Sequence, residues 1–127
     1  MQDALNRRDV ETMVALWDED AEFRPITSGL EGAVYRGPEG LRKWVDALFE
    51  DWEVFEAYAE EFHERDDRVL AFGRWHACGR GSGIALDVST AAWLVRVREG
   101  KVVWWRTFTD RAEALEAAGL TEQQVRG

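Results

Sequence analysis

Apolar residues recur at helical spacing in two stretches of the first half of the chain. The longer stretch begins at Pro38, which suits the first turn of a helix because no backbone partner is lost there. Its apolar stripe, at alternating steps of three and one, consists of Leu41, Trp44, Val45, Leu48, Phe49 and Trp52. A shorter stripe follows Asp9, a good N-cap residue, and ends with Trp17. The pattern predicts two amphipathic helices, with a short helical piece over residues 2–7 before them.

After residue 52 the apolar period changes from that of helices to that of strands. β-branched and aromatic residues alternate with polar ones, and turn residues interrupt them. The pattern predicts a short early strand and four later ones, over residues 21–25, 53–64, 69–80, 84–98 and 101–109. Glu99-Gly100 predicts a tight hairpin between the last two strands.

A short helix is expected over residues 111–118, with Asp110 as its N-cap and Gly119 just past its end. Helices first, one short strand, a long helix and then an antiparallel run of strands indicate the α+β class. No linker, repeat or low-complexity stretch interrupts the chain, so residues 1–127 are expected to form a single domain.

Composition narrows the range of partners. The chain carries a formal net charge of −9, and its basic residues are scattered, so we expect no nucleic-acid partner, since phosphate binding needs a basic face. It contains no run of about 18 apolar residues and no basic-then-apolar leader, which predicts a cytoplasmic protein without a membrane partner. The single cysteine, Cys78, excludes an internal disulfide and suits a reducing compartment.

Several short motifs, in this order and spacing, resemble a known superfamily. They cover residues 6–10, 18–23, 35–41, 97–102 and 109–120. Together they resemble the SnoaL-like, nuclear transport factor 2-like superfamily, which includes polyketide cyclase-like domains. The resemblance implies a cone-shaped, curved, mixed and mostly antiparallel sheet, with N-terminal helices packed over its concave face around a pocket. Members include polyketide cyclases, ketosteroid isomerases, limonene epoxide hydrolases, dehydratases and non-catalytic binders, so the fold leaves the function open. Relatives usually carry a longer first helix.

The resemblance names two sets of catalytic residues, and the sequence can be checked for each of them. Ketosteroid isomerase-like members carry a carboxylate base just before a proline at the end of the first strand, where this chain has Arg24 before Pro25. A guanidinium stays protonated and cannot act as a base, so Arg24 either holds an anionic or carbonyl substrate or lies on the surface. Epoxide hydrolase-like members use an Arg-x-Asp motif, which residues 87–98 lack, and an acid on the last strand, where this chain has Thr107. Both chemistries are therefore disfavoured.

Three further polar residues are candidates for acid–base chemistry, and each has a structural alternative. Histidine side chains titrate near neutral pH, but His76 shares its strand parity with Arg74, so an outward polar face is equally open. Asp110 followed by Glu113 matches a capping box. Asp87 is an acid within a predicted strand. The candidate catalytic residues are Arg24, His76, Asp87 and Asp110.

Seven tryptophans predict an aromatic pocket as well as an aromatic core. The two helix stripes, the middles of three long strands and the glycine-rich loop before residue 37 supply the expected lining. The predicted ligand-binding residues are Trp17, Tyr35, Trp44, Trp75, Trp93, Trp105 and Thr107, with Arg24 as the charged group. Alternation places Val103, Trp105, Thr107 and Thr109 on one face, which the resemblance puts toward the pocket, and Val102, Trp104, Arg106 and Phe108 on the other. Glu22 and Phe23 have opposite parity, so one of the two faces inward.

These features predict a domain that binds a small apolar molecule, with cyclase- or isomerase-type chemistry on a polyketide- or terpenoid-like substrate as one version. The alternative is a non-catalytic ligand-binding or dimeric interaction module. No metal or organic cofactor is expected, because the two histidines are far apart and no glycine-rich phosphate loop is present. Trp104 and Phe108 would leave an apolar patch on the outer face, which predicts a homodimer.

Overall fold

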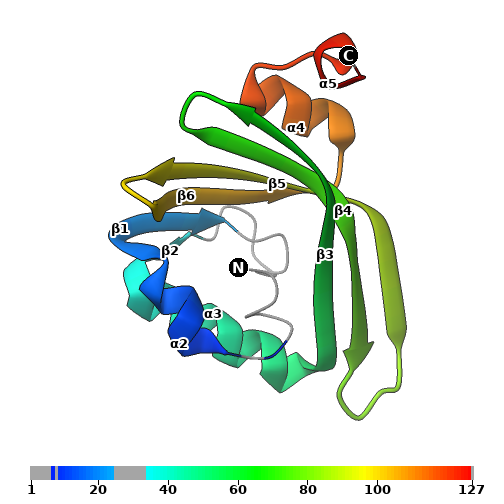
Figure 1. Cartoon of the computed structure of the whole chain (residues 1–127). Helices are drawn as coiled ribbons and strands as arrows, with labels where there is room; N and C mark the ends of the chain where they lie inside the picture. The colour runs from blue at the N-terminus through cyan, green and yellow to red at the C-terminus, as the bar shows by residue number, and fades with distance from the viewer. Residues whose placement is uncertain (1–6, 8, 25–33, 127) are drawn as a thin grey trace.

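Six strands form one mixed sheet in the order β2-β1-β6-β5-β4-β3 (Figure 1). The computed structural model describes residue 7, residues 9–24 and residues 34–126. The strands are β1 (Trp17–Arg24), β2 (Tyr35–Arg36), β3 (Trp52–Arg65), β4 (Arg68–Gly79), β5 (Ala85–Arg98) and β6 (Lys101–Phe108). β1 runs parallel to β6, and every other neighbouring pair is antiparallel. The predicted mixed, mostly antiparallel sheet of the α+β class is confirmed.

Helices cover both faces of this sheet. They are α2 (Val10–Ala15), α3 (Gly37–Asp51), α4 (Arg111–Ala118) and α5 (Glu122–Arg126). In Figure 1, α2 and α3 lie on the concave side of the curved sheet, and α4 lies on the opposite side. We call these the inner and the outer face. The predicted stripe of α3 explains its position, because Leu41, Trp44, Val45 and Leu48 are all buried.

The second predicted helix is shorter than its apolar stripe. Asp9 caps it as predicted, its carboxylate accepting a hydrogen bond from the Thr12 backbone N–H, but the helix ends at Ala15. Trp17, expected as the last residue of the helix stripe, instead begins β1 and pairs with Val102 of β6. The backbone N–H of Val102 donates to the Leu16 carbonyl over 2.8 Å. Pairing with a distant strand therefore overrides the local helical period. Residues 2–6 of the predicted helical piece and most of the loop before residue 37 fall outside the described residues.

The later strands match their predicted ranges to within one or two residues, and their turns have the expected chemistry. Glu99 and Gly100 connect β5 to β6 with φ angles of 53° and 79°. Two consecutive positive φ values are what a tight hairpin turn needs, because its twist then follows that of the strands. Gly100 adopts this conformation without the steric cost that a Cβ brings.

The pairing of β4 with each of its neighbouring strands has a register shift near Gly73, where the long strands bend. The register between β3 and β4 shifts between Ala59 and Glu61, and that between β4 and β5 shifts between Gly73 and Trp75. Such bulges bend a strand and increase its local twist. The β3 backbone approaches so closely that a Cβ on Gly73 would lie 2.0 Å from the carbonyl oxygen of Tyr58. Among the described glycines, Gly73 is therefore the one that a neighbouring strand approaches most closely.

The buried residues form two clusters, one on each face. The inner cluster lies between the sheet and helices α2 and α3, and the outer cluster lies between the sheet and α4. The buried members of the outer cluster are Leu70, Phe72, Ala92, Leu94, Phe108, Ala114, Leu115 and Ala118. Phe108 is only 4% exposed because α4 covers it, and Trp104 is partly buried against the same cluster. The apolar patch behind the homodimer expectation is thus smaller than the sequence suggested, and the homodimer stays a prediction.

Asp110 anchors the helix that covers the outer face. Its carboxylate accepts hydrogen bonds from the backbone N–H groups of Ala112, at 2.8 Å, and Glu113, at 3.4 Å. Asp110→Ala should therefore lower the free energy of unfolding by about 1 kcal/mol, as measured by urea denaturation. Asp110→Asn keeps an accepting oxygen and should cost only a fraction of that. Equal stability of the alanine variant and the unmodified chain would show that the cap contributes nothing.

Candidate functional site

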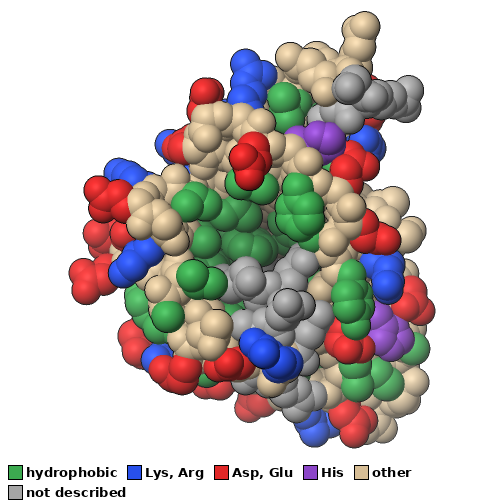
Figure 2. Space-filling model, viewed as in Figure 1, with side chains coloured by type: hydrophobic (Ala, Val, Ile, Leu, Met, Phe, Trp, Pro, Cys, Tyr) green, Lys and Arg blue, Asp and Glu red, His purple; other side chains and the backbone are tan. Residues whose placement is uncertain are grey.

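The aromatic residues predicted for the pocket come together on the inner face. Four of them are buried in the inner cluster: Trp17, Trp44, Trp75 and Trp93. Tyr35 and Trp105 are partly buried against the same cluster. Figure 2 shows a hollow on this side of the molecule with hydrophobic side chains on its floor. The residues that the sequence selected come from five strands and one helix, and they share one environment.

Phe23 lies at the centre of this aromatic group, although the sequence did not single it out. Its ring centroid is 4.8 Å from that of Trp44, 5.5 Å from that of Trp17 and 6.1 Å from that of Trp105. All three pairs meet edge to face, an arrangement that aromatic quadrupoles favour. Tyr35 is a fourth ring neighbour, with centroids 6.5 Å apart. The parity of Glu22 and Phe23 left either side chain free to face inward, and Phe23 is the one that does.

A second aromatic pair sits farther along the sheet. Phe55 of β3 stacks on Trp75 of β4, with ring centroids 5.3 Å apart and planes 23° apart. Trp52, the first residue of β3, is partly buried against the inner cluster as well. Strand alternation in β3 could have found Phe55, since it shares parity with the small residue Ala57 opposite Trp75.

A bulge in β6 changes the predicted faces of two residues. Val102 pairs with Val97 and Trp104 with Arg96, so β6 carries one extra residue at this point. Val102, expected on the outer face, is buried in the inner cluster, whereas Val103, expected inward, lines an outer-face cavity with Trp104. Beyond the bulge the predicted parity holds. Trp105 belongs to the inner cluster, and Thr107 pairs with Trp93 and is half-buried.

Arg24, expected as the charged group of the pocket, does not join the aromatic residues. The buried side chains of β1 are those of Trp17, Ala21 and Phe23, so alternation puts Glu22 and Arg24 on the outer face. The Arg24 guanidinium is 3.8 Å from the Glu22 carboxylate, and its side chain is 45% exposed. The correction has a simple cause, because parity alone does not say which of two faces a helix will cover.

His76 and Asp87 are cross-strand neighbours on the outer face. The strand neighbours of His76, which are Trp75 and Ala77, lie in the inner cluster, so His76 points the other way. The His76 Nδ1 atom is 2.7 Å from the Asp87 Oδ1 atom, and the Asp87 side chain is 80% exposed. Glu56 pairs with His76 from the other side and accepts a hydrogen bond from the Tyr58 hydroxyl, which raises the pKa of Tyr58. With Asp110 capping α4, none of the four catalytic candidates lies with the inner cluster.

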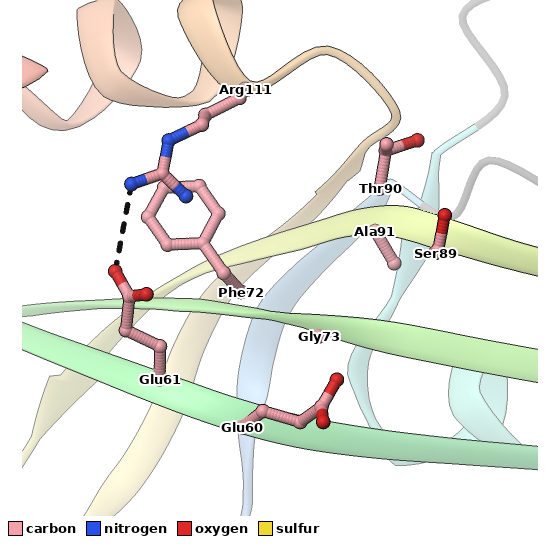
Figure 3. A pocket seen from close by; sticks show the side chains of 8 residues that line it. All are labelled: Glu60, Glu61, Phe72, Gly73, Ser89, Thr90, Ala91 and Arg111. Atoms are coloured by element: carbon pink, nitrogen blue, oxygen red, sulfur yellow. Dashed lines mark ion pairs between the residues drawn. The ribbon is translucent and has the colours of Figure 1, made fainter.

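The outer face carries a cavity of about 230 Å³ beneath α4, with the charged side chains of Glu60, Glu61 and Arg111 in its lining (Figure 3). Arg111 reaches over the Phe72 ring from α4, and its guanidinium lies 3.6 Å from Glu61 and 2.8 Å from Glu122. The hydrogen bond between Glu61 and His63, at 2.5 Å, holds the pKa of Glu61 below its usual range. The Arg111 and Glu61 side chains are therefore already paired with each other, and this ion pair links α4 to β3.

Where the structure describes the chain, the inner face lacks charged side chains of the kind that line this cavity. Among the described residues no polar or charged side chain is buried, so the inner cluster encloses no ionised group there. One polar atom stands out, because the indole Nε1 of Trp17 is buried and has no hydrogen-bond partner. No group of three or more His, Cys, Asp or Glu side chains in the described part of the chain could hold a metal ion. Within the same residues, no helix is long and apolar enough to cross a membrane.

A curved mixed sheet with helices over an aromatic concave face defines a nuclear transport factor 2-like domain. One such protein of unknown function from Burkholderia pseudomallei K96243 is 17% identical, with a TM-score of 0.76 over 99% of this chain and 92% of that one. Another from Burkholderia thailandensis E264 is 26% identical, with a TM-score of 0.73 over 91% of this chain and 87% of that one. TerC, co-crystallised with polyporic acid, is 20% identical, with a TM-score of 0.75 over 91% and 89%.

Sequence comparison gives the family directly. Residues 1–105 match the family model of the SnoaL-like domain, so the chain belongs to the SnoaL-like domain family. No curated protein matches this sequence.

Proposed function

We propose that this domain binds a flat, apolar small molecule on the inner face of its sheet. The observation that carries the proposal is that the aromatic side chains and the candidate ionisable side chains lie in different parts of the molecule. Aromatic side chains of β1, α3, β4, β5 and β6 converge on the inner face, while the candidate ionisable groups pair with one another or cap a helix elsewhere. Aromatic surfaces suit flat apolar ligands because they offer large contact areas with little loss of side-chain entropy.

The partly buried members of the inner cluster supply the surface for a ligand. Tyr35, Trp52 and Trp105 pack against the buried aromatics and still reach solvent. Thr107, two residues beyond Trp105, adds a hydroxyl that can orient a polar atom of the ligand. TerC, which shares the fold, was co-crystallised with the small organic molecule polyporic acid, and this supports the idea that the fold can hold such ligands.

A cyclase- or isomerase-type reaction is the second candidate function. The family context favours it, and Tyr35 and Thr107 bring hydroxyl groups to the predicted lining of the inner face. A threonine hydroxyl is not a general base by itself, so such an enzyme would act by holding an extended polyketide- or terpenoid-like substrate in a reactive conformation. The proposal of ligand binding does not depend on this reaction.

Two adjacent tryptophans provide a sharp test of the proposed face. Trp105 belongs to the inner cluster and Trp104 to the outer one, and both are half-buried. Trp105→Leu should weaken binding of a flat apolar probe such as indane by about ten-fold, the equivalent of about 1.4 kcal/mol of lost aromatic contact. Trp104→Leu should leave the affinity unchanged. Affinities are measured by following the side-chain indole N–H signals of 15N-labelled protein during titration.

Variants at the outer-face residues serve as further controls. Arg24→Ala and His76→Gln should bind indane as tightly as the unmodified chain, and thermal unfolding checks that each variant is folded. Equal weakening by Trp104→Leu and Trp105→Leu would contradict the proposed face. If indane perturbs no indole signal at all, the aromatic cluster is a packed core and the interaction-module alternative takes its place.

A further inference from the structure

The Trp17 indole is a buried hydrogen-bond donor that no described residue satisfies. Its side chain is 3% exposed, and among the described residues the Nε1 atom has no acceptor within hydrogen-bond distance. Buried donors in native proteins almost always have a partner, and an unpaired one lowers stability because its bond to water is not replaced. A molecule that supplied an acceptor would therefore gain affinity from this one atom.

The surroundings of Trp17 explain why no side chain fills that role. Its ring packs edge to face against Phe23 and lies 5.9 Å, centroid to centroid, from the ring of Trp105. Its strand partner is Val102, also buried. None of these side chains offers an acceptor of useful strength, so the indole N–H is left without one within the described part of the chain. A bound ligand can supply the missing acceptor.

We propose that the ligand of the inner face carries a neutral hydrogen-bond acceptor, such as a ketone or ester oxygen, which accepts from Trp17 Nε1. This inference rests on the proposed ligand-binding function and makes it more specific. A neutral oxygen fits better than a carboxylate, since no charged side chain among the described residues is buried to compensate an anion. Arg24, the residue that would have favoured an anion, lies on the outer face. The ligand class is a flat, apolar and uncharged carbonyl compound.

Three probes with the same ring system separate the hydrogen bond from apolar contact. They are indane, 1-indanone and indane-1-carboxylate, all titrated against the unmodified chain and the Trp17→Phe variant. The ratio of the affinity for 1-indanone to that for indane should fall by about three- to ten-fold in Trp17→Phe, because the aromatic side chain remains while the N–H is lost. The affinity for indane measures any change in apolar contact, and the ratio corrects for that change. The carboxylate should bind at least about ten-fold more weakly than the ketone.

A measurement on the unmodified chain keeps the inference testable if Trp17→Phe does not fold. The Trp17 indole N–H signal should move downfield on addition of 1-indanone and not on addition of indane, as hydrogen bonding to an oxygen requires. If both probes bind but the Trp17 signal and the affinity ratio are unaffected, the hydrogen bond is wrong and the proposed function stands. Carboxylate binding as tight as ketone binding would overturn the neutral class. If none of the three probes binds, the proposed function itself fails.

Discussion

Phe23→Ala should lower the free energy of unfolding by about 3–5 kcal/mol, the usual cost of removing a buried phenylalanine side chain. Phe23 is 4% exposed, and its ring meets four other aromatic rings of the inner cluster. Removing it takes away the buried area and leaves a cavity that rigid neighbours cannot fill. Because small domains are stable by only about 5–15 kcal/mol, this single change should bring the protein close to unfolding at room temperature.

Phe62→Ala is the matched control, because the same side chain is removed from an exposed position. Phe62 lies on β3 and is 62% exposed, so its loss should change the unfolding free energy by less than about 0.5 kcal/mol. Guanidinium denaturation followed by far-UV circular dichroism measures both variants. Similar losses of stability in the two would mean that Phe23 is not the centre of a packed cluster.

Gly73→Ala should be the most damaging of the glycine substitutions, at about 3 kcal/mol. A Cβ at this position would lie 2.0 Å from the Tyr58 carbonyl oxygen and 2.9 Å from the Ala59 Cα atom. Both are backbone atoms of the adjacent strand β3, so the clash cannot be relieved by rotating a side chain, and the β3–β4 pairing must open. The same opening should disturb the bend of the sheet, and with it the inner face.

Gly83→Ala separates this clash from the general cost of replacing a glycine. Gly83 has a φ of +70°, and a Cβ there would meet no atom within 4 Å. Its substitution should cost only the strain of a left-handed residue, about 1 kcal/mol. Urea denaturation of both variants gives the comparison. A Gly73→Ala variant as stable as Gly83→Ala would show that the close strand approach is readily relaxed.

The elements whose patterns depend on neighbouring residues could be read from the sequence. The residues of the stripe from Leu41 to Trp52 are spaced three or one apart, and the turn at Glu99-Gly100 has two residues. Local periodicity and turn chemistry are therefore enough to define both. The same holds for the caps at Asp9 and Asp110. The aromatic residues of the predicted pocket could be identified for a related reason, because large apolar side chains in the middle of long strands are usually buried.

The polar half of the predicted site could not be read in this way. The position of Arg24 before Pro25 made it the expected charged group of the pocket. Strand alternation only divides β1 into two faces, and the packing of Phe23 against Trp44 of α3 decides which of them is inner. His76 and Asp87 were chosen as single residues. Their pairing at 2.7 Å depends on the register of β4 against β5, which no short motif encodes.

The sequence by itself determined the α+β class, the order of the long elements, the helix caps and the aromatic character of the inner face, but it predicted neither the short strand β2 nor the short helix α5. These follow from spacings and conformational preferences that act over a few residues. Only the tertiary structure decided that Trp17 starts a strand, that a bulge in β6 exchanges the faces of Val102 and Val103, and that α4 covers Phe108. Each of these depends on segments far apart in the chain meeting one another. The free energy gained by packing and pairing these distant segments outweighs the local conformational preference of either segment.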